Sequence, residues 1–208
     1  MIITYAITVC NEFVEIQRLM NFLLEKKRSK DNIVVLYDTK NGDKGVEEFL
    51  RSKSVNSEFS WIPGEFNGHF ADWKNTLKKF CNGDYIFQID ADEMPNEHLI
   101  SNLPNIIESN DGVEVILVPR VNIVEGIDPG LHLNQWGWVM DEKNRINWPD
   151  YQWRIWMNKD EIKWINNVHE RLDGFKTYST LPKKVEYSLY HHKTIKKQVE
   201  QNKFYSTL

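Results

Sequence analysis

Apolar and polar positions in the first part of the chain follow two alternating periods. Short apolar runs that suit β-strands cover 2–9, 32–37, 59–62 and 85–89. Between them, segments with apolar residues at helical spacing cover 12–27, 46–51 and 70–80. This alternation predicts an α/β fold with a mainly parallel sheet and helices on both of its faces.

The second part of the chain has a different pattern. One long strand is predicted within 113–124, and further strands within 151–157 and 162–165. Loops dense in Trp, Asn, Asp, Gly and Pro lie between them, and a final helix is predicted at 194–205. We interpret 1–208 as a single domain with two functional halves, 1–112 and 113–208.

Length and composition add limits to this picture. A chain of 208 residues can bury a sizeable core. The two cysteines, Cys10 and Cys81, allow no disulfide framework and no zinc spacing. No apolar run approaches the ~18 residues of a membrane span, and the opening run is interpreted as a strand and not as a signal peptide. We therefore predict a cytoplasmic protein.

Charge is unevenly distributed along the chain. The formal net charge is -4, but residues 171–208 hold eight Lys or Arg against three Asp or Glu. That segment is thus +5, which leaves -9 for 1–170. A basic tail can meet a phosphate-rich ligand, or its lysines can simply be solvated. A polyanionic partner, nucleic acid included, therefore stays open.

The most informative stretch is Tyr-Ile-Phe-Gln-Ile-Asp-Ala-Asp-Glu at 85–93. A strand that ends in acids leaves carboxylates at its carboxyl end, where open α/β sheets bind ligands. Strand alternation puts Asp90 and Asp92 on the same side, with the small Ala91 between them. Two such oxygen donors suit Mg²⁺ or Mn²⁺, ions that usually partner phosphates. The alternative is a solvated acidic turn.

Six ordered blocks carry a family resemblance. Ile-Thr-Val-Cys-Asn-Glu, Val-Val-Leu-Tyr-Asp-Thr-Lys-Asn-Gly-Asp, His-Phe-Ala-Asp-Trp-Lys-Asn and Ile-Asp-Ala-Asp-Glu resemble the nucleotide-sugar-binding half of family 2 glycosyltransferases, which have the GT-A (Rossmann-like) fold. Downstream, Gln-Trp-Arg-Ile-Trp and Val-His-Glu-Arg-Leu resemble the acceptor side of the bacterial subgroup that builds lipopolysaccharide cores. One departure is the turn after the second strand, where the family has an Asp-Asp-Gly-Ser-Thr-Asp-like sequence.

For the donor, the resemblance implies a site at the ends of the first, second and fourth strands. Asp38 would accept a hydrogen bond from the base, although it can also serve the turn that follows. Asn11 and Glu12 would bind the nucleotide at a helix start, although Asn11 can also cap that helix. Asn75 would face the donor pocket, with an exposed helix position as its alternative. The implied donor-binding set is Val9, Asn11, Glu12, Asp38, Asn75, Asp90 and Ala91.

For the metal, the resemblance implies a division of labour between the acids. Asp92 would ligate Mn²⁺ or Mg²⁺ directly, and Asp90 would contact the ribose or a water on the metal. Glu93 would orient the loop or touch the sugar. His191 is the candidate for a late ligand, with His192 as its competitor. The cation would neutralise charge on the leaving diphosphate.

On the acceptor side, Glu170 is the candidate general base, because an inverting displacement needs a carboxylate to take the hydroxyl proton. A structural His-Glu pair is the alternative, and His169 would assist or contact substrate. Trp136 and Trp138 suit a stacking groove for a sugar or a base. Arg154 would grip a phosphate of the acceptor, or would pair with a core carboxylate.

The function that follows is metal-dependent, inverting transfer of a sugar from a nucleotide-sugar donor to an acceptor hydroxyl, in a surface glycan or a similar molecule. One alternative is transfer to a hydroxylated base in DNA. Another is a catalytically inactive GT-A module that binds sugar or nucleotide. A nucleotidyltransferase is disfavoured, because no Gly-rich basic loop follows the first strand.

Overall fold

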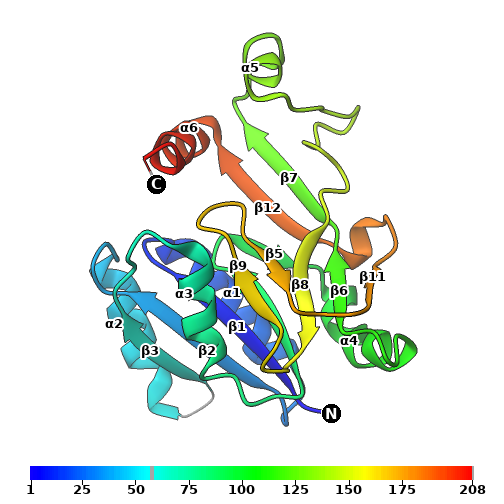
Figure 1. The fold of residues 1–208 in the computed structure, drawn as a ribbon. Helices are drawn as coiled ribbons and strands as arrows, with labels where there is room; N and C mark the ends of the chain where they lie inside the picture. The colour runs from blue at the N-terminus through cyan, green and yellow to red at the C-terminus, as the bar shows by residue number, and fades with distance from the viewer. Residues whose placement is uncertain (57–58, 208) are drawn as a thin grey trace.

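A computed structural model describes residues 1–56 and 59–207. Its central sheet contains seven strands (Figure 1). In spatial order they are β11 (Tyr178–Thr180), β6 (Val115–Val118), β8 (Gln152–Met157), β4 (Tyr85–Asp90), β1 (Ile3–Val9), β2 (Asn32–Asp38) and β3 (Ser60–Gly64). β1 pairs in parallel with β2 and β4, and β2 with β3, whereas β8 runs antiparallel to its neighbours β4 and β6. The predicted mainly parallel α/β sheet is confirmed.

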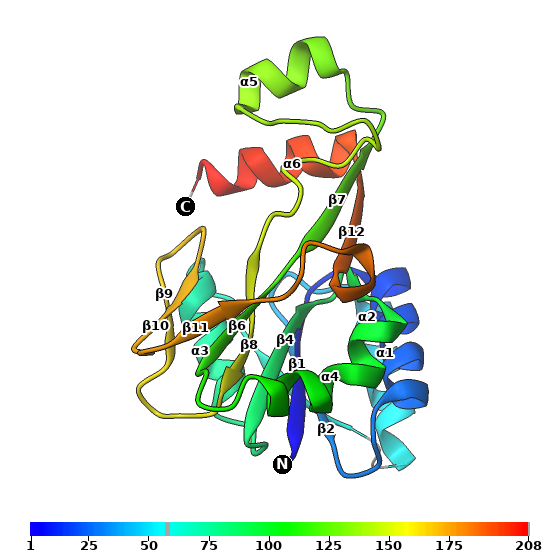
Figure 2. The ribbon, with the colours of Figure 1, turned by 90° about the vertical axis from the view of Figure 1, so that its right-hand side faces the viewer.

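Both faces of this sheet are covered (Figure 2). On one face lie α1 (Phe13–Lys26), α2 (Lys44–Lys53) and α4 (Glu97–Ser109); on the other lie α3 (Phe70–Lys78) and the hairpin of β9 (Lys163–Ile165) and β10 (Arg171–Asp173). Alternate residues of β1 and β2 point into two separate apolar cores. One core includes Leu19 and Leu103, and the other includes Leu77 and Leu172.

A smaller layer extends from the carboxyl ends of the parallel strands. β12 (Leu189–Thr194) lies between β5 (Glu93–Pro95), its antiparallel partner, and β7 (Arg120–Glu125), its parallel partner. After β7 the chain forms a projecting arm with two short helices, η2 (Pro129–Leu133) and α5 (Asn134–Trp136) (Figure 1). The last helix, α6 (Ile195–Tyr205), follows β12. Two further short turns are η1 (Ser54–Asn56) and η3 (Val185–Tyr187).

Two predictions differ from the structure. The long strand predicted within 113–124 is two strands, β6 and β7, in different sheets, because Pro119 separates them and has no N–H to continue a strand ladder. No element was predicted for 94–112, where α4 lies; its buried Leu99, Leu103 and Ile107 follow helical spacing, but Pro104 interrupts the pattern. The final helix and the elements of the first half agree with the predictions to within a few residues.

The sequence-based limits on cysteine chemistry also hold. Cys10 and Cys81 are both free thiols. Burial raises the pKa of each to about 12, assisted at Cys10 by the nearby Glu12 and Asp38 carboxylates. Both thiols are therefore protonated at neutral pH. Within 1–56 and 59–207, the helices are all too short or too polar to cross a bilayer.

Candidate active site

One cleft opens where the parallel strands β1, β2 and β4 end. It encloses about 990 Å³, at the upper end of the range for small-molecule sites. Ligands bind at this edge of open α/β sheets because the loops there fan apart. The predicted site residues that line it are Val9, Asn11, Glu12, Asp38, Asp90, Ala91, Asp92, Trp136, Trp138, Arg154, His169, Glu170 and His191. α6 and β12 supply its far wall.

At the donor end, two carboxylates, those of the buried Asp38 and the partly exposed Glu12, shape the loops after β1 and β2. Asp38 Oδ1 accepts hydrogen bonds from the backbone N–H groups of Lys40 (3.0 Å) and Phe66 (3.1 Å). Glu12 Oε2 accepts from the N–H groups of Cys10 (2.9 Å) and Asn11 (3.1 Å). These contacts fix the backbone at the predicted nucleotide site.

Asn75 is the one predicted donor residue that the structure does not bring to the cleft. Its Nδ2 donates to the carbonyl of Trp164 at 2.8 Å, and its Oδ1 accepts from the Trp164 N–H at 2.9 Å. Both ends of the amide are thus used to fasten α3 to β9. This tertiary role accounts for a polar residue in the middle of a helix.

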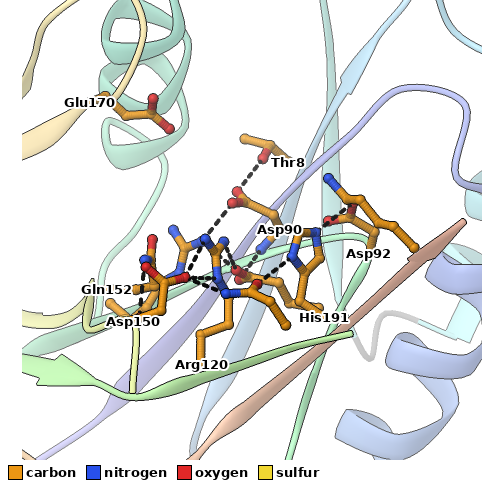
Figure 3. A network of polar contacts seen from close by, with 12 residues as sticks. Thr8, Asp90, Asp92, Arg120, Asp150, Gln152, Glu170 and His191 are labelled. Carbon is orange, nitrogen blue, oxygen red and sulfur yellow. Dashed lines mark hydrogen bonds and ion pairs between the residues drawn. The ribbon is translucent and has the colours of Figure 1, made fainter. Parts of the chain in front are cut away.

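Asp90 lies at the centre of a buried charge cluster (Figure 3). Its Oδ2 is 2.7 Å from Arg154 Nη2, and its Oδ1 is 3.3 Å from Lys74 Nζ and accepts from Thr8 Oγ1 at 3.2 Å. Burial raises the pKa of Asp90, but Arg154 and Lys74 outweigh burial and hold that pKa well below its ordinary value. Asp90 is therefore ionised at neutral pH.

Glu93 joins this cluster to a second arginine. Its Oε1 is 2.6 Å from Arg154 Nη2 and 3.0 Å from Arg120 Nη1, and the Glu93 side chain is fully buried. Arg154 is itself only 3% exposed. Of the two roles predicted for Arg154, the structure shows its guanidinium paired with core carboxylates. Buried charges of this kind are stable only when each has its partner.

A chain of hydrogen bonds orients His191 toward Asp92 (Figure 3). Asn122 Nδ2 donates to Asp150 Oδ2 at 2.6 Å, which turns Asn122 Oδ1 toward His191 Nδ1 at 2.9 Å. Because an amide oxygen can only accept, Nδ1 of His191 must carry a proton. The other ring nitrogen, Nε2, then faces Asp92 Oδ2 at 3.2 Å. A second residue that fixes a histidine in this way is typical of metal-ligating imidazoles.

Asp92 and His191 can supply two ligands to a divalent cation. Within 1–56 and 59–207, no group of three His, Cys, Asp or Glu side chains converges on one point, and Asp90 is turned toward Arg154 and Lys74. A pair of protein ligands fits Mg²⁺ or Mn²⁺, which commonly complete their shell with phosphate oxygens and water. The competitor His192 is 59% exposed and points toward Glu125 at 4.0 Å.

Glu170, the candidate base, is held on the opposite wall. Its Oε1 is 2.6 Å from Lys74 Nζ, and the ammonium of Lys74 also lies 4.7 Å from the centre of the Trp164 ring. The neighbouring His169 has a φ of +53°, which is uncommon for residues other than glycine, and its ring packs edge-on against Tyr205. Lys74 thereby connects Glu170 with Asp90 across the cleft.

The aromatic residues of the second half divide into two groups. Trp156 and Trp164 pack edge-to-face in the core. On the projecting arm, the ring of Trp136 lies 4.7 Å from that of Trp138 and 4.9 Å from that of His132. Trp136 and Trp138 both line the cleft.

Sequence reasoning missed several residues of this site. Lys74 had a readable signal, because it lies three residues from each of the buried Ala71 and Leu77 on one helix face. Asn122 and Asp150 carried no local signal, since their role depends on contacts between β7 and the loop before β8. Lys193, whose Nζ is 3.3 Å from Asp92 Oδ2, was seen only as one charge of a basic tail.

Comparisons with known proteins agree with this arrangement. The model of the family described as Glycosyl transferase family 2 matches residues 4–180. No curated protein matches the chain. Among solved structures, S. aureus TarS 1-349 in complex with UDP-GlcNAc is similar with a TM-score of 0.63 at 17% identity, covering 93% of this chain and 59% of that one. The same protein in complex with UDP gives a TM-score of 0.60 at 15% identity, covering 100% and 65%. The chain thus spans less than two thirds of TarS 1-349.

Proposed function

The chain belongs to glycosyl transferase family 2, has the GT-A fold, and from this premise we propose that it transfers a sugar from a nucleotide-sugar donor to an acceptor hydroxyl with inversion. One observation carries the proposal. Asp92 with His191 on one side of a single cleft, and Glu170 on the other, are the groups that a leaving diphosphate and an attacking hydroxyl require.

The donor would occupy the cleft from the ends of β1 and β2 to Asp92. Asp38, Asn11 and Glu12 would surround the nucleoside, and Asp90 the ribose. TarS, which has the same fold, was solved with UDP-GlcNAc and with UDP. UDP-sugars are therefore the first donors to test.

A divalent cation, Mn²⁺ or Mg²⁺, would be held by Asp92 Oδ2 and His191 Nε2 and would act as a Lewis acid toward the leaving diphosphate. Asn122 Oδ1 would accept a hydrogen bond from the Nδ1–H group of His191 and so leave the lone pair of Nε2 for the cation. Asp150 holds Asn122 in the required orientation.

Glu170 would take the proton of the attacking hydroxyl. As the acceptor oxygen bonds to the anomeric carbon, the bond from that carbon to the diphosphate breaks, and the hydroxyl proton passes to the Glu170 carboxylate. Lys74 positions this carboxylate through one oxygen, Oε1. His169, beside Glu170, would contact the acceptor.

The acceptor would be a glycan whose sugar ring stacks on the arm. The rings of Trp136 and Trp138, which line the cleft and lie 4.7 Å apart, offer an apolar surface for such stacking. The same rings can stack on a nucleobase, so a DNA acceptor is a competing outcome of the test below.

The deciding experiment measures release of nucleoside diphosphate from UDP-sugars and GDP-sugars with Mn²⁺, alone and with glycan or hydroxymethylated DNA acceptors. We expect slow hydrolysis without an acceptor and faster release with a glycan. Stimulation by DNA alone would shift the acceptor assignment. If donors bind but none is consumed under any condition, the chain is a binding module and the proposed function is wrong.

A further inference from the structure

Lys193 occupies an unexpected place beside the candidate metal ligands. Its Nζ lies 3.3 Å from Asp92 Oδ2, the same oxygen that His191 Nε2 faces at 3.2 Å. His191 and Lys193 are two residues apart on β12, so both side chains point to one side of that strand. Lys193 is buried, with 8% of its side chain exposed.

This ammonium competes with a divalent cation for Asp92. A cation ligated by Asp92 Oδ2 would have to share that oxygen with the Lys193 ammonium, and two positive charges beside one carboxylate oxygen repel each other. In the structure the Asp92 carboxylate already contacts the Lys193 ammonium. The carboxylate of Asp92 is thus already neutralised by the chain itself.

Lys193 contacts α6 as well as Asp92. Its Nζ donates to Gln201 Oε1 of α6 at 2.7 Å, and Gln201 Nε2 donates to Tyr205 Oη at 2.7 Å. The other charged groups near this point are Glu12, whose carboxylate acts electrostatically on Asp92, and Lys197, which is paired with Glu15 at 2.6 Å. Lys193 lines the cleft, and its flexible four-carbon stem lets the ammonium turn toward a bound phosphate.

We propose that Lys193 is an internal counter-ion that neutralises Asp92 in the donor-free protein and moves to the diphosphate when donor and divalent cation bind. The proposal rests on the proposed function, since it concerns the same donor site. The cation takes Asp92 Oδ2, and the displaced ammonium donates to a phosphate oxygen.

This exchange makes cation and donor bind cooperatively. Without a diphosphate, the cation must displace the Lys193 ammonium from Asp92 to a position that has no anionic partner. This cost weakens the binding of the cation. With a diphosphate present, the ammonium gains a new charged partner. By thermodynamic linkage, the donor must then strengthen cation binding by the same factor as the cation strengthens donor binding.

The test compares Lys193→Met with Lys196→Met, which removes the same charge from an exposed position on α6. Mn²⁺ affinity is measured by electron paramagnetic resonance without nucleotide, and the affinity of UDP and GDP by calorimetry with and without Mn²⁺. For Lys193→Met we expect Mn²⁺ alone to bind about tenfold tighter. We expect the diphosphate to bind about tenfold weaker in the presence of Mn²⁺, because a charge-assisted hydrogen bond is lost. Lys196→Met should match the unaltered protein in both.

Lys193→Arg keeps the charge and is the control for loss of structure. Its affinity for Mn²⁺ without nucleotide should be near that of the unaltered protein. The proposal is overturned if Lys193→Met leaves either affinity unchanged. If the unaltered protein binds the diphosphates and Lys193→Met binds Mn²⁺ and the diphosphates equally well, only the role of Lys193 is refuted. If the unaltered protein binds neither diphosphate, with or without Mn²⁺, the proposed function fails and the role of Lys193 fails with it.

Discussion

Residues 1–112 and 113–208, the proposed donor half and acceptor half, contribute opposite charges to most of the buried ion pairs of the cleft. The donor half supplies the carboxylates at the end of β4 and the start of β5, and the acceptor half supplies their cationic partners. The pairs across the boundary are Asp90 with Arg154, Glu93 with Arg120 and Arg154, and Asp92 with Lys193. Lys74 with Glu170 has the reverse order. The two halves are therefore fastened to each other by the same groups that form the site.

The backbones of the two halves differ as well. Within the described residues, all non-glycine residues with positive φ lie in the acceptor half: Asn144, Asn147, Asp150, Asn166 and His169. Each such conformation costs about 1 kcal/mol or more and persists only where surrounding contacts enforce it. The donor half is thus built from regular elements, whereas the acceptor half is held by particular polar contacts, several of them at the cleft.

The largest effect is expected where the halves meet at the candidate metal ligands. Asp92→Asn removes the charge that His191 and Lys193 share, and should lower the rate of transfer by about 10⁴-fold while leaving the thermal midpoint nearly unchanged. Initial rates with saturating donor and Mn²⁺ measure it. Asp160→Asn, at an exposed position, is the control. Activity of Asp92→Asn within tenfold of the control would remove Asp92 from the reaction.

Arg154→Met should weaken the attachment between the two halves and so destabilise the fold. It leaves the Asp90 and Glu93 carboxylates short of a buried partner, and we expect the free energy of unfolding to fall by about 3–5 kcal/mol. Urea denaturation followed by Trp fluorescence measures this change. Arg51→Met, which breaks an exposed pair with Glu47, should cost less than about 1 kcal/mol. Equal effects of the two substitutions would show that the buried cluster contributes no more than a surface pair.

Glu170→Gln tests whether donor binding and proton removal depend on different halves of the chain. Because only proton removal is impaired, kcat should fall by about 10²- to 10³-fold while donor affinity stays unchanged. Single-turnover kinetics and calorimetry with the donor distinguish the two quantities. Glu161→Gln, an exposed neighbour, is the matched control. A loss of donor affinity with normal turnover would place Glu170 in the donor site and the base elsewhere.

Asn122→Ala should produce the smallest of these effects. Without the Asn122 oxygen, His191 is free to rotate or to change tautomer, and Mn²⁺ affinity in the presence of UDP should fall by about 10- to 100-fold. Titration monitored by electron paramagnetic resonance measures it, with Asn134→Ala, on the exposed arm, for comparison. Unchanged Mn²⁺ affinity would mean that the geometry of His191 does not depend on Asn122.

The sequence by itself determined the features that arise within one segment. Periodicity along 1–90 was enough to predict the donor-half strands and helices, because a strand or helix buries one face at a fixed spacing. The placement of Asp90 and Asp92 at a strand end followed in the same way. α4 was missed although its apolar spacing is regular, because Pro104 interrupts it.

The tertiary structure alone decided which side chains meet. Asp92 and His191 are 99 residues apart, and Asp90 and Arg154 are 64 apart. Their contacts depend on the strand registers of β12 with β5 and of β8 with β4, and a shift of one residue would turn each side chain to the other face. For this reason the contact of His191 with Asp92, the ion pairs of Arg154 and the contact of Lys193 with Asp92 could be read only from the folded chain.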